Sequence, residues 1–113
     1  LLGDISFGNI TLQIISSITE PVQAVLYQNG YLGTADYTSV LIYPTGSGYI
    51  IDGDFDGPMI ELNGASNVTF DGRVSQSGIA DLIITNINNG TSASTIQFIN
   101  DASNNIVEYC TIK

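Results

Sequence analysis

The sequence predicts an all-β fold, specifically a parallel β-helix (solenoid) with three strands per turn and about three turns. Short apolar runs alternate with clusters of Gly, Asn, Asp and Ser, which is typical of strands joined by turns. Helical periodicity is almost absent. One segment also repeats at a near-constant step, as expected of a fold whose units stack on their neighbours.

The strand-like runs follow one another along the whole chain of 113 residues, which is about the length of one domain. We therefore expect residues 1–113 to be a single β-helix domain or a fragment of a longer one. The predicted strands are residues 10–16, 24–28, 39–44, 49–52, 59–63, 67–72, 81–86, 95–100 and 105–113.

The repeat is the most informative feature. "IELNGASNVTF" from Ile60 aligns with "IQFINDASNNIV" from Ile96, and a one-residue insertion brings the "ASN" of residues 65–67 onto that of residues 102–104. An antiparallel sandwich would also have short strands separated by Gly and Asn, but it would not return the same triplet at the same place.

The repeat sorts the strands into turns of three: 24–28, 40–44 and 49–52; then 59–63, 68–72 and 82–86; then 95–99 and the strands within 105–113. Asn67 and Asn104 recur at one turn, where Asn tolerates a left-handed backbone and bonds nearby backbone groups. The residues predicted to point inward in columns are Leu41, Ile51, Ile60, Leu62, Phe70, Ile83, Ile96 and Phe98.

Charge is the most lopsided property of the chain. Eleven acidic residues stand against Arg73 and Lys113, there is no His, and the formal charge is −9. Nucleic acid and anionic membranes are poor partners for such a surface, because each needs a basic face. No apolar run is long enough to insert into a membrane. The single Cys110 excludes an internal disulfide and is most simply a small buried apolar residue.

Asp52, Asp54 and Asp56 alternate ahead of Gly57, as in the first half of a calcium loop. Position twelve of such a loop is Asn63, not a bidentate Glu, so an EF-hand is excluded. Three interpretations stay open: a calcium site of another design using Asp52, Asp54 and Asp56, a sugar-contacting surface, and an ordinary turn.

The repeat gives this acidic loop a neighbour. Residues 52–58 connect the third strand of one turn to the first strand of the next, and residues 86–94 connect the equivalent strands one turn later. The two loops should therefore lie side by side. If Asp54 and Asp56 contact a cation or sugar hydroxyls, Asn88 and Asn89 should help them.

Catalytic chemistry has few candidate residues. Arg73, beside Asp71 in "FDGRVSQ", is the only basic residue before Lys113. A lyase or hydrolase acting on polysaccharides needs a positioned base or a pair of carboxylates across the substrate. We expect Arg73 to form a local surface pair with Asp71 or to be a plain turn residue, and we do not expect catalysis.

"GPMIELNGASNVTFDGR", "DLIITN" and "TIQFINDASNNIVEYCTIK" resemble the repeats of right-handed β-helix, pectin-lyase-like domains. They are most similar to those in very large surface proteins that Gram-negative bacteria export by the type IX secretion route. The resemblance implies a right-handed coil, a secreted or cell-surface location, and a longer parent chain. The fold itself serves adhesin stalks, carbohydrate-binding surfaces and polysaccharide-cleaving enzymes alike.

From the residues and the resemblance together we expect a non-catalytic scaffold or adhesion module, which displays loops to extracellular glycans or other surface components. The alternative is part of a polysaccharide lyase or glycoside hydrolase. No cofactor is expected other than the calcium considered above.

Overall fold

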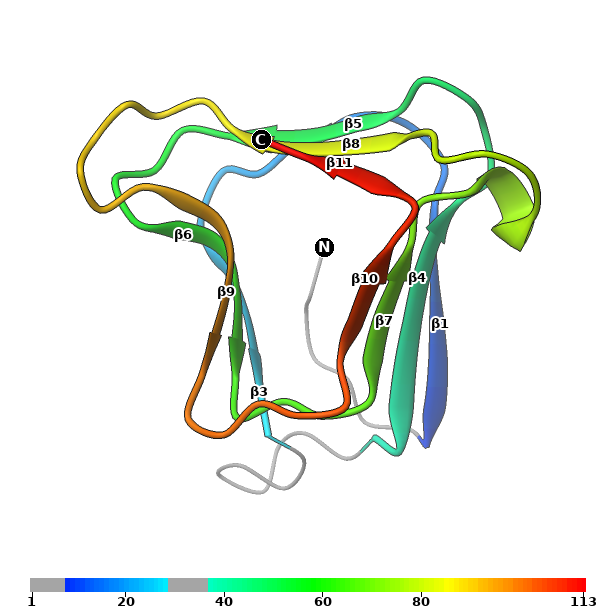
Figure 1. Cartoon of the computed structure of the whole chain (residues 1–113), viewed down its shortest axis with the longest axis horizontal. Helices are drawn as coiled ribbons and strands as arrows, with labels where there is room; N and C mark the ends of the chain where they lie inside the picture. Colours follow the sequence, from blue (N-terminus) through cyan, green and yellow to red (C-terminus); the bar gives the residue numbers. More distant parts are fainter. Residues whose placement is uncertain (1–7, 29–36) are drawn as a thin grey trace.

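The computed structural model describes residues 8–28 and 37–113, and strands dominate them (Figure 1). A short 3-10 helix, η2 (Val74–Gln76), is the one helical element in these ranges. The strands are β1 (Asn9–Ile14), β2 (Ile18–Thr19), β3 (Ala24–Tyr27), β4 (Ser39–Pro44), β5 (Ile50–Gly53), β6 (Pro58–Asn63), β7 (Val68–Asp71), β8 (Leu82–Asn86), β9 (Ser94–Ile99), β10 (Ile106–Glu108) and β11 (Cys110–Ile112).

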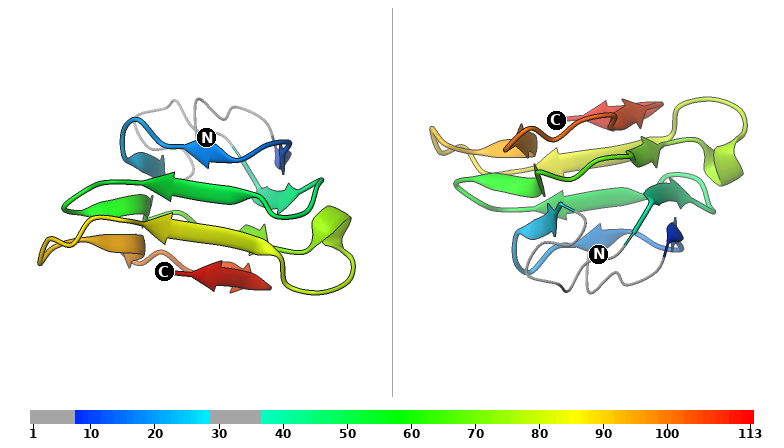
Figure 2. Two further views of the ribbon diagram at one scale, coloured as in Figure 1. Left: turned by 90° about the horizontal axis from the view of Figure 1, so that it is seen from above. Right: turned by 90° about the horizontal axis from the view of Figure 1, so that it is seen from below.

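The strands form three parallel sheets, and the chain visits the sheets in a fixed rotation. The sheet orders are β1-β4-β7-β10, β2-β5-β8-β11 and β3-β6-β9. Every pairing within these sheets is parallel. Viewed down the short axis of the molecule, which measures 22 Å, the sheets surround a common interior (Figure 1), and Figure 2 shows the strands in successive layers. Parallel pairing rules out the antiparallel sandwich.

The predicted repeat is confirmed by the strand register. Ile60 pairs with Ile96, and Ser66 pairs with Ser103 across the next corner. The pairing step thus lengthens by one residue between the two points, as the aligned "ASN" triplets require. Asn100 and Asp101 take up the insertion with left-handed backbones, at φ 54° and 62°, a conformation that short polar side chains tolerate.

The interior is built from residues that alternate along each strand, because successive strand side chains point to opposite faces. Ile51, Ile60, Leu62 and Phe70 are fully buried, as predicted, and pack with others from all three sheets. The buried apolar residues are Ile14, Ala24, Leu26, Tyr37, Val40, Ile42, Ile51, Met59, Ile60, Leu62, Ala65, Val68, Phe70, Leu82 and Ile84.

Two of the predicted inward residues belong to the opposite face. Leu41 lies between Val40 and Ile42, which are both fully buried, and is itself only partly buried. Ile83 has the same relation to its neighbours in β8. Both strands carry apolar residues on both faces, so the sequence alone did not show which set of alternate residues points inward. Phe98 shares the face of buried Leu62 but is 48% exposed, because β9 is the last strand of its sheet.

Asn67 and Asn104 have the left-handed backbones that the sequence predicts, with φ of 63° and 56°. The Asn67 carboxamide also donates to the Thr38 carbonyl oxygen at 3.3 Å. Asn105, which follows Asn104, links two turns. Its carboxamide donates to the Ala65 carbonyl at 2.9 Å and accepts from the Val68 amide at 2.9 Å. Backbone groups at this corner are therefore satisfied by Asn side chains.

Candidate functional site

Two loops on one edge of the sheets form a polar surface outside the strands. Residues 54–57 join β5 to β6, and residues 87–93 join β8 to β9. We call this surface the loop edge. The two loops lie side by side on the left of Figure 1, where the green β5–β6 and yellow β8–β9 connections project from the sheets. This is the arrangement that the repeat predicts.

Asn86 attaches the first loop to the second. Its Oδ1 accepts from the Phe55 amide at 3.0 Å, and its Nδ2 donates to the Phe55 carbonyl at 2.9 Å. The same Nδ2 lies 3.0 Å from the carbonyl oxygens of Gly57 and Ser94. One carboxamide thus satisfies backbone groups of the β5–β6 loop and of Ser94, the first residue of β9.

The outer side chains of the loop edge are also paired between the turns. Asn88 donates to Asp54 Oδ1 at 2.8 Å, and Asn88 Oδ1 accepts from the Gly90 amide at 2.7 Å. Asp56 Oδ1 accepts from the Ser92 amide at 3.0 Å. A Cβ on Gly90 would come within 2.3 Å of the Asp56 carboxyl carbon, so a larger residue would displace the exposed Asp56 side chain. The predicted neighbourhood of Asp54, Asp56 and Asn88 is therefore observed.

Asn89 stands beside this network on the same loop and is exposed, as are Gly90 and Thr91. Asp54 and Asp56 are exposed as well. The loop edge therefore presents carboxylate, carboxamide and hydroxyl groups to solvent while its backbone is fixed from beneath.

The three aspartates do not form the cluster that the alternating pattern predicts. β5 ends at Gly53, so the extended backbone that would align the side chains of Asp52, Asp54 and Asp56 does not continue. Asp54 and Asp56 bond to different groups, and Asp52 Oδ1 is buried with no hydrogen-bond partner in the described part of the chain. Within residues 8–28 and 37–113, no three His, Cys, Asp or Glu side chains are grouped to hold a metal ion.

A second polar group lies at the corner between β7 and β8. The Arg73 guanidinium binds Asp71 through two bonds, Nε to Oδ1 at 3.0 Å and Nη2 to Oδ2 at 2.7 Å. The Arg73 amide also donates to Asp71 Oδ1 at 3.1 Å. The Asp71 side chain is 2% exposed and that of Arg73 is 25% exposed. The local pair is therefore present, but its carboxylate is buried, whereas the sequence predicted a pair at the surface.

The electrostatics of this corner favour the ionised pair. The hydrogen bond from Arg73 holds the pKa of Asp71 below its usual value, against the opposing effect of burial. The Arg73 guanidinium carbon also lies 4.2 Å from the centre of the Tyr109 ring, a cation-π distance. Nearby, burial is the main cause that raises the pKa of Cys110 to about 11, so its thiol is protonated at neutral pH.

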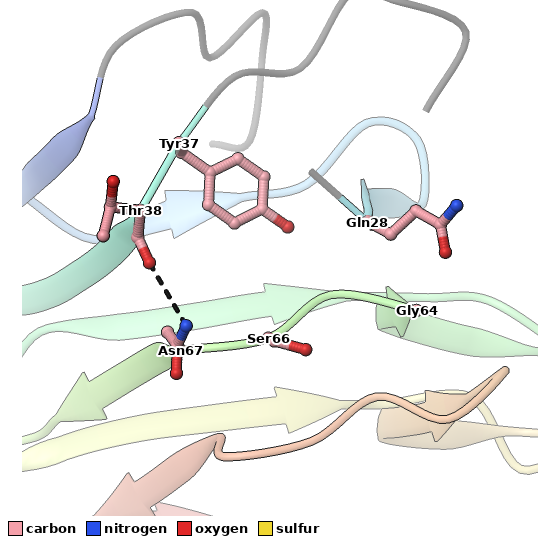
Figure 3. Close-up of a pocket in the computed structure, with 6 residues that line it drawn as sticks. All are labelled: Gln28, Tyr37, Thr38, Gly64, Ser66 and Asn67. Atoms are coloured by element: carbon pink, nitrogen blue, oxygen red, sulfur yellow. Dashed lines mark hydrogen bonds between the residues drawn. The ribbon is translucent and has the colours of Figure 1, made fainter. Parts of the chain in front are cut away.

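A hollow of about 610 Å³ lies at the corner between β3 and β4 (Figure 3). Its lining is mostly polar, and the Asn67–Thr38 bond described above crosses one side of it. Tyr37 lies at its upper side, where its hydroxyl donates to the Tyr27 carbonyl at 2.6 Å and burial raises its pKa. The lining residues are Gln28, Tyr37, Thr38, Gly64, Ser66 and Asn67.

Sequence reasoning missed the residues that hold the corners. Asn86 and Asn105 were not predicted to have a role, nor was Asp81, whose carboxylate accepts from the Gly48 amide at 2.8 Å. One signal in the sequence could have identified Asn86. Asn86 ends β8, Gly53 ends the neighbouring strand β5, and the two residues pair with each other. An Asn facing a Gly at two aligned strand ends has room to bond the loop beside it.

No family model matches the sequence, and the comparisons with curated proteins and with solved structures find no match. The described residues also include no helix long and apolar enough to cross a membrane.

Proposed function

We propose that the three parallel sheets are the walls of a right-handed parallel β-helix of about three turns. The rotation of the chain through the sheets and the pairing of each strand with the equivalent strand of the next turn support this. Right-handed connections are favoured because nearly all parallel crossover connections in proteins have that hand. A stack of this kind holds surface loops in fixed relative positions.

We further propose that the domain is a non-catalytic scaffold or adhesion module of a secreted or cell-surface protein. The observation that carries this proposal is the Asn88–Asp54 hydrogen bond of 2.8 Å, which joins exposed loops of two different turns. Polar side chains held in place in this way suit recognition, since little conformational entropy is lost when they bind a ligand. The resemblance of the repeats to those of bacterial surface proteins supports the location.

The ligand class follows from the groups on the loop edge. Asp54, Asn88, Asn89 and Thr91 offer hydrogen-bond donors and acceptors that match sugar hydroxyl groups. The formal charge of −9 repels uronic acids and other anionic polymers. We therefore propose contact with neutral glycans, and we expect binding to weaken little as salt is added.

The enzyme alternative requires Arg73 to act on a substrate. Its guanidinium is held by Asp71 through two bonds and lies over the Tyr109 ring. An Arg held in this way is already neutralised, and a buried carboxylate would lose its partner if the Arg moved. These contacts of Arg73 support the scaffold function over a lyase or hydrolase activity.

The test is a glycan array followed by calorimetry with the purified chain. We expect binding to neutral glycans without turnover, and at least a tenfold loss of affinity in Asn88→Ala. The matched control is Asn100→Ala, because Asn100 also donates to a side chain of the neighbouring turn, Asn63 Oδ1 at 2.6 Å, but at a different corner. That variant should bind like the wild type.

Two results contradict the proposal. One is cleavage of any uronic-acid polymer that disappears in Arg73→Ala, which would establish the enzyme. The other is glycan binding that Asn88→Ala and Asn100→Ala reduce equally, which would place the contact surface outside the loop edge.

A further inference from the structure

The described part of the chain contains two Asn–Gly pairs, Asn63–Gly64 and Asn89–Gly90. A third pair, at residues 29–30, lies outside the residues that the structure describes. An Asn that precedes Gly is prone to deamidation, because Gly has no Cβ to shield its backbone nitrogen from the Asn carboxamide. The two described pairs share this chemistry, so their surroundings decide which of them reacts.

The Asn63–Gly64 pair is held at both of its reacting groups. The Gly64 amide donates to the Ile99 carbonyl oxygen of the next turn at 2.8 Å. The Asn63 carboxamide donates to Glu61 Oε1 at 3.2 Å and accepts from Asn100 Nδ2 at 2.6 Å. Attack of the Gly64 nitrogen on the carboxamide requires these bonds to open first, so this pair is protected.

The Asn89–Gly90 pair lies in the β8–β9 loop, on the loop edge, and both of its residues are exposed. Within residues 8–28 and 37–113, no hydrogen bond holds the Asn89 carboxamide. The Gly90 amide donates to a side-chain oxygen, Asn88 Oδ1, at 2.7 Å, and this bond is exposed to solvent. A single exposed hydrogen bond opens at little cost, so this pair is free to react.

We propose that Asn89 is a site of spontaneous deamidation. The Gly90 backbone nitrogen attacks Asn89 Cγ and forms a new C–N bond, while the bond from Cγ to Nδ2 breaks. The leaving nitrogen takes up the proton lost by the Gly90 amide, carried by water, and departs as ammonia. A cyclic succinimide results. Water then opens the ring at one of its two C–N bonds, and an aspartyl or an isoaspartyl residue is left at position 89.

Both products change the loop edge. Each adds one carboxylate, so the formal charge moves from −9 to −10. The isoaspartyl product also lengthens the main chain by one carbon between Asn88 and Gly90, which separates the Gly90 amide from Asn88 Oδ1. We expect glycan affinity to fall as a result. That effect rests on the proposed function, whereas the deamidation rests on the loop alone.

Asn88 sets the rate of the reaction. Its Oδ1 holds the Gly90 amide proton while its Nδ2 is anchored to Asp54 Oδ1 at 2.8 Å. Asn88→Ala should therefore speed deamidation at Asn89 by about two- to fivefold, because one exposed hydrogen bond no longer restrains the attacking nitrogen. Asn100→Gly is the matched control. It removes a bond between turns at another corner, Gly suits the left-handed backbone there, and the rate at Asn89 should not change.

The experiment follows deamidation by mass spectrometry. The 113-residue chain is incubated in mildly alkaline buffer, either folded or unfolded in guanidinium chloride, and is then denatured and digested with trypsin. Cleavage after Arg73 puts Asn63 and Asn89 on different fragments, and sequencing of each fragment locates the residue at which NH₂ is replaced by OH. In the folded protein, Asn89 should react at least about tenfold faster than Asn63. In denaturant the two rates should converge, because the bonds that protect Asn63 are gone.

Three results would overturn the proposal. The first is equal protection of Asn63 and Asn89 in the folded protein. The second is an equally large difference between them in denaturant, which would trace it to the neighbouring sequence and not to the fold. The third is an Asn88→Ala variant that deamidates no faster than the wild type. None of these rates depends on glycan binding, so failure of the proposed function would be seen separately, on the glycan array.

Discussion

Asn86 and Phe55 bind each other through both groups of the Asn86 carboxamide and both backbone groups of Phe55, at 3.0 and 2.9 Å. The two residues are 31 positions apart and belong to successive turns. This contact fixes the loop edge from beneath, while Asn88 and Asp54 join it on the outside.

Asn86→Ala should therefore lower the free energy of unfolding by about 2 to 3 kcal/mol, because it leaves several backbone groups without a hydrogen bond. Asn88→Ala should lower it by less than about 1 kcal/mol, since the Asn88–Asp54 bond is exposed. Urea denaturation of both variants measures the difference. Equal losses would mean that Asn86 does not anchor the loop.

The Asp71–Arg73 pair should make stability fall in acid. The pKa of Asp71 is lowered in the folded state, so the pair's contribution is complete above the pKa of an unfolded Asp, about 3.9. It is lost as the pH falls through the lower pKa of the folded protein. Asp71→Asn should be less stable than the wild type at pH 7, and the gap should close as the pH falls below the pKa of the folded carboxyl.

Denaturation at fixed pH values from 2 to 7 gives the two stability curves. Asp101→Asn is the control, because Asp101 is exposed and Asn suits its left-handed backbone. If the curves of Asp71→Asn and wild type stay parallel into acid, the ion pair does not stabilise the fold.

Gly72 is required by close approach between turns. A Cβ on Gly72 would overlap the Tyr109 carbonyl oxygen and lie 2.6 Å from its carbonyl carbon, and backbone atoms have little freedom to move aside. Gly72→Ala should cost about 3 kcal/mol or more, or prevent folding. Gly48→Ala tests backbone strain alone: Gly48 has a φ of 74° and open space around it, and its substitution should cost about 1 kcal/mol. Thermal denaturation ranks the two, and a milder effect at Gly72 would contradict the close approach.

The repeat made much of the architecture predictable. It placed the strands in turns of three and required the shift of one residue between Ile60 and Ser103, which the register shows. It also placed the two loops of the loop edge together, so the contact of Asp54 with Asn88 could be anticipated. A repeat carries this information because equivalent residues of stacked turns must lie beside each other.

The errors have local causes. Leu41 and Ile83 were assigned to the core because both faces of their strands carry apolar residues, and a shift of one residue reverses the faces. The three aspartates were aligned by assuming that extended backbone continued past Gly53, where β5 ends. Asn86 was missed because its partners come from segments distant in the sequence.

The sequence by itself determined the strands other than β2, the grouping of the strands from β3 onward, and the neighbouring loops, since these follow from alternation, turn residues and the repeat. The tertiary structure alone decided which face of each strand is buried, that Asp71 is buried beneath Arg73, and that Asn86 holds Phe55. Each of these depends on where another turn places its atoms, because a hydrogen bond forms only within a narrow range of distance and angle.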